Sequence, residues 1–400
     1  MASVAQKDVS SINFEDTSVA FSSKSDFQLQ KTYWLFAMMN RTWLVNLGTF
    51  FIKLALRLHL PIKKLIRSTI FAQFCGGETI DECAKTIDHL NQFGVGTILD
   101  YSIEGEDHEA VFEATTLELL RTIERAAQSE SIPFTVFKVS GIASTDLLEK
   151  VQSKTLLSPQ EQHNYERVQQ RVDELCKLAH AKKVRIFIDA EESWIQDVID
   201  ELAYTMMERY NSERAIVFNT YQLYRHETLA AFKNAYLKAR EHGYFLGGKL
   251  VRGAYMEKER VRARENNYRS PIHVSKEATD QDFNLAIDFA LDHIELIEIC
   301  LGTHNEYSSQ YCASRMEKNG IKPSDTRIWF AQLLGMSDNI SFTMANLGYN
   351  VAKYVPYGPI DSVMPYLFRR AEENKSIAGQ SSREYLLVKR EMKRRQLRTI

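Results

Sequence analysis

Residues 184–191 read VRIFIDAE, residues 215–222 read AIVFNTYQ and residues 247–255 read GGKLVRGAY. Each is a short apolar run that ends in polar side chains, and segments of helical periodicity separate them. The pattern extends outward to five further runs, at 95–102, 134–141, 297–305, 327–336 and 350–358. Eight such strands, each followed by a helix, predict an α/β fold, a closed parallel (β/α)₈ barrel of the TIM type. A doubly wound open sheet is the competing fold, but no strand-to-helix turn carries the GxGxxG motif of its dinucleotide-binding form.

The segments outside the barrel are predicted from their composition. Residues 1–28 form a polar leader, which we expect to be flexible, and residues 29–94 are expected to be helical, with a break at Pro61. The catalytic barrel is predicted over 95–376 and a basic helix over 377–400. The basic residues of 53–67 and of the tail suit either docking on the rest of the chain or an anionic membrane surface, and docking is favoured.

Composition excludes several classes of function. The 400 residues carry a formal net charge of −2, which gives no reason to expect a nucleic-acid partner. The five cysteines form no CxxC pair and the histidines form no HExxH motif, so we expect a reducing compartment and no bound metal. The first thirty residues lack a signal peptide, and charged residues interrupt every window long enough to span a bilayer, so the sequence predicts a cytoplasmic protein without a transmembrane helix.

Residues 354–370, YVPYGPIDSVMPYLFRR, combine a strand end, a Gly-Pro turn and a helix that opens near Asp361. Tyr366, Arg369 and Arg370 stand at i, i+3 and i+4 of that helix, so one aromatic ring and two guanidinium groups share a face. Paired arginines suit a carboxylate, because each planar fork donates two parallel hydrogen bonds. The alternative is a solvated pair of charges on the helix surface.

Polar side chains recur at the carboxyl ends of the predicted strands, where a barrel of this kind places its active site. These strand-end residues are Lys138, Asp189, Asn219, Lys249, Arg252, Thr303, His304, Leu333 and Tyr354. Lys138, Arg369 and Arg370 are three cations that can bind the carboxylate of an acidic substrate. Tyr354, Tyr366 and Leu333 can enclose a small carbon ring. No GxSxG motif is present, and no cysteine at a strand end has a histidine beside it, so the pocket needs a redox cofactor for its chemistry.

In combination, KLVRGAY, IDAEE, FNTYQ, GTHN and YVPYG followed by YLFRR resemble the proline dehydrogenase family over roughly residues 70–376. The resemblance implies a modified barrel with extra N-terminal helices, and FAD-dependent oxidation of L-proline to Δ¹-pyrroline-5-carboxylate by hydride transfer to flavin N5, the first step of proline catabolism. The implied catalytic residues are Lys138, Asp189, Tyr354, Arg369 and Arg370. The implied substrate-binding residues are Lys138, Leu333, Tyr354, Tyr366, Arg369 and Arg370, and Asp189 is expected to organise the site near Tyr354. The implied FAD-binding residues are Asn219, Lys249, Arg252, Gly253, Thr303 and His304.

The resemblance also implies partners. The family passes electrons to quinone or another membrane acceptor, which suggests peripheral contact of the basic, aromatic N-terminal region and tail with the inner face of a membrane. A separate pyrroline-5-carboxylate dehydrogenase is expected to consume the product. Three residues depart from many bacterial members: Lys249 stands in place of arginine, Ala72 in place of an acidic gate residue and Met256 in place of tryptophan. Lys249 and the KLVRGAY spelling point to the monofunctional, eukaryote-like branch.

Three other functions stay open on the sequence. A hydroxyproline dehydrogenase can use the same scaffold, because a pocket change of one small group shifts preference by only about 1–3 kcal/mol. A catalytically silent binding protein is the alternative from another class, although Lys138, Asp189 and both arginines are all retained. A phosphate-binding barrel enzyme is disfavoured, because Gly335 and Gly358 are single glycines.

Overall fold

The structure is a computed structural model that describes residues 12–58, 61–102, 108–376 and 380–396; at 42, 44, 53–57, 372–376 and 380–382 it describes only the backbone. Contacts divide the chain into two compact units. The central unit is Gly105–Ala331, and the terminal unit combines Met1–Glu104 with Gln332–Ile400. Positions 1–11 of the predicted leader, 59–60 of the predicted helical region, 103–107 of the predicted barrel, and 377–379 and 397–400 of the predicted tail lie outside the described residues.

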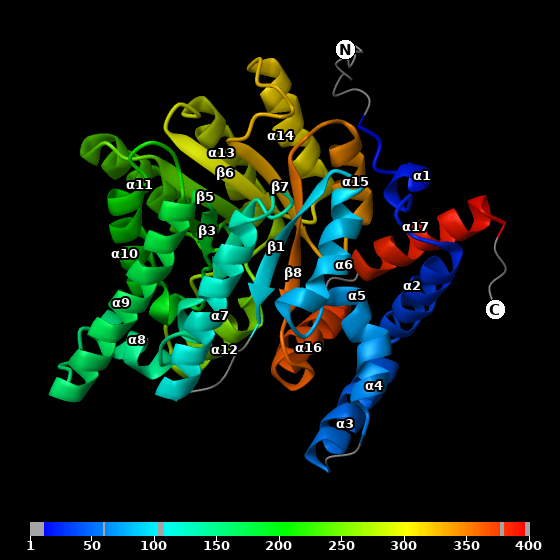
Figure 1. The fold of residues 1–400 in the computed structure, drawn as a ribbon, viewed down its shortest axis with the longest axis horizontal. Coiled ribbons are helices and arrows are strands. Elements are labelled where there is room, and N and C mark those ends of the chain that lie inside the picture. The colour runs from blue at the N-terminus through cyan, green and yellow to red at the C-terminus, as the bar shows by residue number, and fades with distance from the viewer. Residues whose placement is uncertain (1–11, 59–60, 103–107, 377–379, 397–400) are drawn as a thin grey trace. The chain divides into compact units, whose positions relative to one another are not determined.

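The eight predicted strands are present and form a closed barrel in the order β1 to β8 (Figure 1). They are β1 Val95–Tyr101, β2 Phe134–Phe137, β3 Arg185–Ile188, β4 Val217–Gln222, β5 Leu246–Val251, β6 Ile297–Gly302, β7 Ile328–Leu333 and β8 Val351–Tyr357. The pairings given for β2 through β7 and for β1 with β8 are parallel. The (β/α)₈ barrel predicted from the sequence is therefore confirmed.

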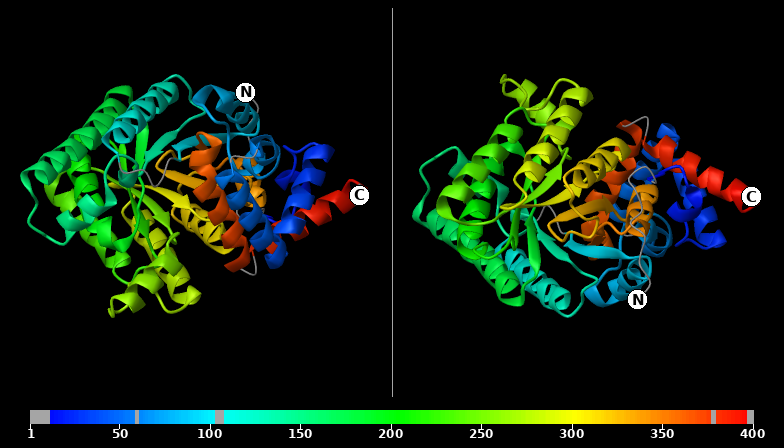
Figure 2. Two further views of the ribbon diagram at one scale, coloured as in Figure 1. Left: turned by 90° about the horizontal axis from the view of Figure 1, so that it is seen from below. Right: turned by 90° about the horizontal axis from the view of Figure 1, so that it is seen from above.

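The strands of the central unit carry helices on their outer side (Figure 2). These helices are α7 Glu109–Ala127, α8 Thr145–Gln152, α9 Pro159–Lys182, α10 Ser193–Tyr210, α11 Thr228–His242, α12 Met256–Glu265, α13 Lys276–Asp292 and α14 Glu306–Lys318, and a 3₁₀ turn, η3, spans Val139–Gly141. At the amino-terminal end of the strand layer, Phe134, the first residue of β2, is stacked on Phe187 at 4.4 Å between ring centroids. Arg185, at the start of β3, lies over Phe134 at 5.2 Å and pairs with Glu298 at 3.2 Å. This end is packed, so the polar residues of the opposite, carboxyl end are the ones available for a site.

The terminal unit combines both ends of the chain around one apolar cluster that includes Phe36, Phe74, Leu367 and Val388. Its helices are α1 Thr17–Ala20, α2 Asp26–Met39, α3 Thr42–Arg57, α4 Lys63–Ile66, η2 Arg67–Phe71, α5 Ala72–Phe74, α6 Ile80–Asn91, α15 Asp338–Asn346, α16 Ile360–Ser376 and α17 Gln380–Arg394. The predicted break at Pro61 separates α3 from α4, and Thr79 caps α6 by accepting a hydrogen bond from the Glu82 amide at 3.3 Å.

The basic tail packs, as favoured from the sequence, and its partners are α1, α2 and α16. Leu387, Val388 and Met392 of α17 are buried in the apolar cluster of the terminal unit. Throughout the described ranges, we find no helix that combines the length and the apolar character needed to cross a membrane.

Candidate active site

The central unit brings its predicted site residues to one edge of the strand layer. Lys138 follows β2, Asp189 follows β3, and Lys249 lies in β5. Thr303 and His304 follow β6, whose Cys300 is the register partner of Lys249. Because β2 to β6 are hydrogen-bonded in order and parallel, their carboxyl ends share this edge.

Lys249 and Asp189 form a buried ion pair. The Lys249 ammonium donates a hydrogen bond to Asp189 Oδ1, and the two residues are only 5% and 9% exposed. The ammonium also lies over the ring of Phe187, 5.0 Å from its centroid. The sequence predicted roles for both residues but not their pairing. A buried cation fixed in this way has little rotational freedom and presents its charge at one place on the strand edge.

Arg252 is held in a network at the end of β5. Its guanidinium donates to Asp280 Oδ1 at 2.7 Å, to Thr303 Oγ1 at 2.6 Å and to Ser308 Oγ at 3.0 Å, and lies 4.3 Å from the centroid of the Phe283 ring. Burial lowers the pKa of Arg252, and the hydrogen bond to Asp280 opposes that shift. The structure thus brings the predicted residues Arg252 and Thr303 together, and it adds Asp280 and Ser308, which the sequence analysis missed.

Gly253 supplies a close backbone approach beside Arg252. Its φ is +133°, and a Cβ at this position would lie 2.5 Å from the ring of Tyr224. The helix that follows is anchored to α10, because the fully buried Glu259 of α12 accepts hydrogen bonds from the Ser193 amide and hydroxyl, both at 2.6 Å. The KLVRGAY turn is therefore fixed at both ends, by the Arg252 network and by Glu259.

Replacing Gly253 with alanine is expected to lower the free energy of unfolding by about 2–4 kcal/mol. The cost of a strained φ and the cost of a clash with the Tyr224 ring add to each other. The matched control is Gly243→Ala, since Gly243 has φ +74° but nothing within 4 Å of its Cβ position. That change should cost only about 1 kcal/mol. Urea unfolding of both variants measures the difference. Equal losses of unfolding free energy would show that the clash with Tyr224 does not contribute to the cost.

Asn219 points away from the Lys249 ion pair. Its side-chain amide donates to Asp200 Oδ1 of α10 at 2.8 Å, and its Oδ1 accepts from the Thr220 amide at 2.9 Å. Asn219 is completely buried between β4 and that helix. The structure does not bring it together with Lys249 or Arg252, and its role toward a cofactor stays a prediction.

Lys138 lies beside a buried carboxyl group. Glu191 accepts hydrogen bonds from the Ser140 amide at 2.9 Å and from the Ser140 hydroxyl. Burial raises the pKa of Glu191 to about 7, although the bonds from Ser140 and the charge of Lys138 oppose that rise. The sequence places Glu191 in the IDAEE strand end but predicts no role for it.

Glu191 should make stability depend on pH. Its pKa is about 7 in the folded chain and 4.5 ordinarily, so the folded state binds the proton more tightly. Its contribution to the free energy of unfolding is complete below pH 4.5 and is lost as the pH rises through about 7. The loss is on the order of 3 kcal/mol. Glu191→Gln should remove this part of the pH dependence in urea unfolding. An unchanged pH profile in the variant would contradict the assignment.

The terminal unit holds the second set of predicted residues. Leu333 ends β7, Tyr354 lies in β8, and the Leu334 amide donates to the Tyr354 carbonyl at 2.9 Å. On α16 the Arg370 guanidinium lies over the Tyr366 ring, 5.0 Å from its centroid. Tyr366 and Arg370 are 6% and 7% exposed, and Arg369 is half-buried. The shared helical face is confirmed for Tyr366 and Arg370, and burial of Arg370 excludes a fully solvated charge pair.

A buried lysine next to Tyr354 escaped the sequence analysis. Lys353 Nζ pairs with Asp338 at 2.9 Å and donates to the Met336 carbonyl at 2.5 Å, and the residue is completely buried. It holds the turn that follows Leu333, in which Gly335 has φ +76° and Ser337 φ +50°. The departures at Ala72 and Met256 both lie at exposed positions.

Comparisons with known proteins agree with these features. A family model described as proline dehydrogenase matches residues 83–383. Proline dehydrogenase 1, mitochondrial, of Dictyostelium discoideum is 30% identical over 95% of this chain and 74% of its own length. Hydroxyproline dehydrogenase of Xenopus laevis is 29% identical over 96% of this chain and 90% of its own.

A solved structure supports the fold. Proline utilization A (PutA) of Bdellovibrio bacteriovorus, inactivated by N-propargylglycine, superposes with a TM-score of 0.71 at 19% identity. The match covers 91% of this chain but only 38% of that one, so the present chain spans well under half of PutA. Since the family model and the first of these relatives cover most of the residues, the chain belongs to the proline dehydrogenase family and is an oxidoreductase.

Proposed function

We propose that this chain oxidises L-proline to Δ¹-pyrroline-5-carboxylate with FAD as the hydride acceptor. The observation that carries the proposal is the arginine pair of α16, in which the buried Arg370 stacks on Tyr366 beside Arg369. Proline keeps a permanent carboxylate, and two guanidinium forks fix both its position and its orientation. Orientation of the ring carbon next to nitrogen is the main contribution that a protein makes to hydride transfer.

The residues of the central unit fit FAD. Lys249 supplies a fixed buried cation, and Arg252 and Thr303 supply donors for phosphate oxygens. Gly253 is assigned to the cofactor by resemblance. We assign His304 and Asn219 to the same cofactor by resemblance. Bound FAD supplies the two-electron chemistry that none of these side chains can perform.

The remaining residues would prepare the substrate. Leu333, Tyr354 and Tyr366 are proposed to enclose the proline ring and exclude water, and Lys138 to add a third charge toward the carboxylate. Asp189 holds Lys249 in place through the ion pair, which makes it a positioning residue. The retention of Lys138, Asp189 and both arginines favours an active enzyme over a silent binding protein.

The electrons must leave the reduced flavin. We propose quinone or another membrane acceptor as their destination, with the chain in peripheral contact with the inner face of a membrane. The product would pass to a separate pyrroline-5-carboxylate dehydrogenase.

Hydroxyproline oxidation is the second candidate, and the similarity to the Xenopus hydroxyproline dehydrogenase favours keeping it. Steady-state kinetics with a soluble dye as acceptor separate the two. A higher kcat/KM for L-proline than for trans-4-hydroxyproline is expected, and the reverse order would replace the proposed substrate.

A further inference from the structure

Helix α3 is apolar on two opposite sides. Val45 and Ile52 pack against the apolar cluster of the terminal unit. Four large apolar side chains of the same helix are exposed: Trp43 at 62%, Leu47 at 45%, Phe50 at 61% and Phe51 at 55%. With 3.6 residues per turn, these four align in one stripe, on the side of the helix opposite Val45 and Ile52. A second apolar side that faces outward indicates a second apolar environment for the helix.

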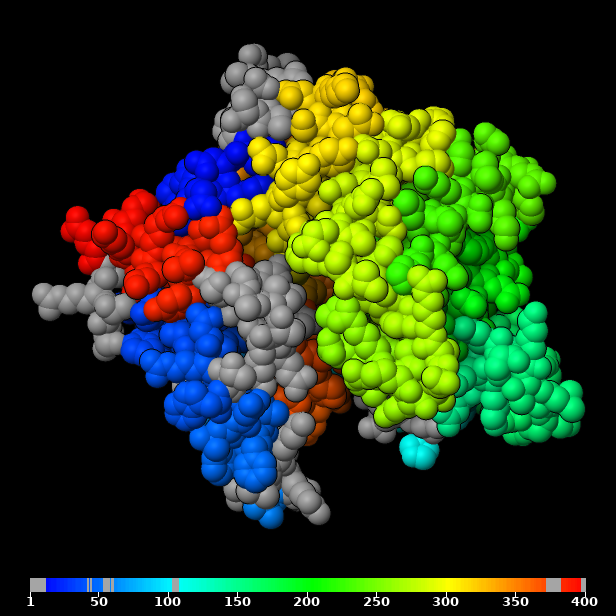
Figure 3. All heavy atoms as spheres, turned by 180° about the vertical axis from the view of Figure 1, so that it is seen from behind, coloured from blue at the N-terminus to red at the C-terminus, as the bar shows by residue number. Residues whose placement is uncertain are grey.

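Helix α2 repeats this arrangement. Leu29, Tyr33 and Phe36 are buried. Its exposed large apolar residues are Phe27 at 70%, Trp34 at 47% and Met38 at 49%. They stand at i, i+7 and i+11 and therefore share a side. We call these three residues and the four of α3 the outer stripe; residues of both helices lie on the molecular surface in Figure 3, in blue.

The sequence around the outer stripe is strongly cationic. Residues 27–77 contain seven Lys or Arg and no Asp or Glu, whereas the whole chain has a formal net charge of −2. Two of the seven are engaged within the protein, because Lys63 pairs with Asp361 at 2.5 Å and Arg67 pairs with Glu82 at 2.8 Å. Lys31, Arg41 and Lys64 are exposed. Tryptophan and phenylalanine beside exposed cations are typical of segments that bind the interface of an anionic bilayer.

The geometry favours a helix that lies in the membrane plane. α3 has 16 residues, fewer than the roughly 20 that a spanning helix requires. Its inner side is attached to the terminal unit through Val45 and Ile52, so only the outer side is available to lipid. Charged side chains at the edge of the stripe can reach phosphate groups while the rings enter the acyl boundary.

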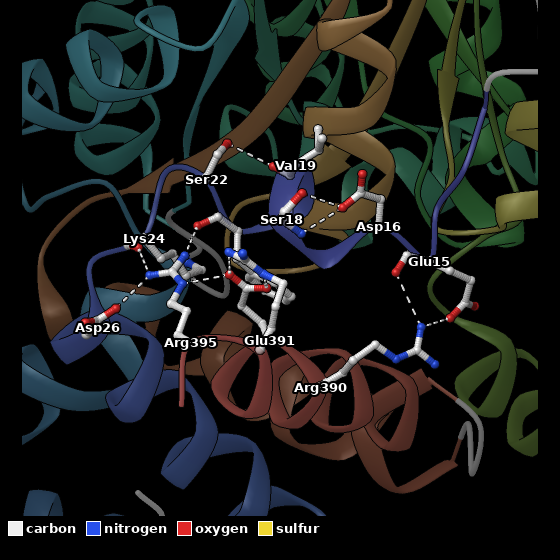
Figure 4. Close-up of polar contacts among 12 residues, drawn as sticks. Glu15, Asp16, Ser18, Val19, Ser22, Lys24, Asp26, Arg390, Glu391 and Arg395 are labelled. Atoms are coloured by element: carbon white, nitrogen blue, oxygen red, sulfur yellow. Dashed lines mark hydrogen bonds and ion pairs between the residues drawn. The ribbon is translucent and has the colours of Figure 1, made fainter. Parts of the chain in front are cut away.

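The C-terminal helix is the other basic candidate, but its arginines are engaged within the protein (Figure 4). Arg383 and Arg390 pair with Glu15, and Arg395 pairs with Asp26 at 2.9 Å and with Glu391 at 2.7 Å. Its apolar side is covered, as described above. The tail therefore fixes the two chain ends to each other.

We propose that the outer stripe binds the surface of an anionic phospholipid bilayer and that the tail does not. This inference deepens the proposed membrane contact and rests on that part of the proposed function. It is independent of the substrate. It also gives the proposed transfer of electrons to a membrane acceptor a defined docking surface.

The test is co-sedimentation of the full chain with vesicles of phosphatidylcholine and phosphatidylglycerol in equal amounts, with pure phosphatidylcholine for comparison. Binding should require phosphatidylglycerol and weaken with salt. Trp43→Ser/Phe50→Ser should reduce the apparent affinity by about tenfold or more, because burial of each ring contributes about that much. Lys31→Glu/Lys64→Glu should abolish the preference for anionic vesicles.

Two matched controls should bind like the parent chain. Leu156→Ser/Val274→Ser removes two large apolar residues that are 95% and 93% exposed but lie outside the stripe. Lys389→Ala/Lys393→Ala removes two exposed cations of the tail. Quenching of tryptophan fluorescence by brominated lipids should disappear in Trp34→Phe/Trp43→Phe, which leaves only Trp194 and Trp329.

Several results would overturn the proposal: no vesicle binding by the parent chain, equal binding by the stripe variant, or loss of binding in the tail variant. A stripe variant that turns a dimer into a monomer without affecting vesicle binding would assign the stripe to a second copy of the chain. Proline-dependent reduction of a soluble dye is measured in parallel. Vesicle binding without dye reduction would refute proline oxidation but would still support the proposal that the outer stripe binds a membrane.

Discussion

Replacing Arg370 with methionine is expected to lower kcat/KM for L-proline by about 2–5 kcal/mol, mainly through KM. Methionine keeps the apolar contact with the Tyr366 ring but removes the guanidinium that lies over it. The substrate carboxylate, which is proposed to bind both arginines, would then face Arg369 alone. Steady-state kinetics with a soluble dye provide the measurement.

The matched control for this change is Arg390→Met, which removes an exposed arginine on α17 that pairs with Glu15. We expect its kinetics to equal those of the parent chain. The flavin content of Arg370→Met should also be unchanged, because the cofactor residues are assigned to the central unit. Parent-like kinetics in Arg370→Met would remove the arginine pair from the substrate site.

Replacing Lys249 with methionine is expected to lower the free energy of unfolding by about 3–5 kcal/mol, the usual cost of removing one member of a buried ion pair. The change leaves the Asp189 carboxylate, which is only 9% exposed, without its ammonium partner. Urea unfolding at neutral pH measures the loss. The same variant should bind FAD more weakly, because the cation assigned to the flavin is gone.

The double variant Lys249→Met/Asp189→Asn separates these two effects. Removal of both charges should recover most of the lost stability, since the penalty arises from one uncompensated charge. FAD binding should stay weak. If the double variant were as unstable as the single one, the ion pair would not be the source of the loss.

The barrel could be predicted because each strand is a continuous apolar run covered on both faces, so its position depends on local sequence alone. The shared face of Tyr366 and Arg370 was predictable for a similar reason, because helical periodicity fixes i and i+4 neighbours. Both features are set by residues close together in the chain.

Contacts between distant segments could not be predicted in this way. The Lys249–Asp189 pair joins two strands 60 positions apart, and the Arg252 network reaches Asp280 and Ser308 on two further helices. Asn219 appeared equivalent to the other strand-end residues, but its side chain is directed to Asp200 on α10. The outward direction of Trp43 and Phe50 depends on which apolar side of α3 packs against the terminal unit, and the sequence of a helix with two apolar sides does not reveal that side.

Proline oxidation by this chain is tested most directly by the visible spectrum of the purified chain, reconstituted with FAD, before and after anaerobic addition of L-proline. The absorption bands of oxidised flavin are expected, and so is their loss when proline is added, because the substrate reduces the bound cofactor. A chain that takes up no flavin, or one whose flavin spectrum is indifferent to proline, would contradict proline oxidation.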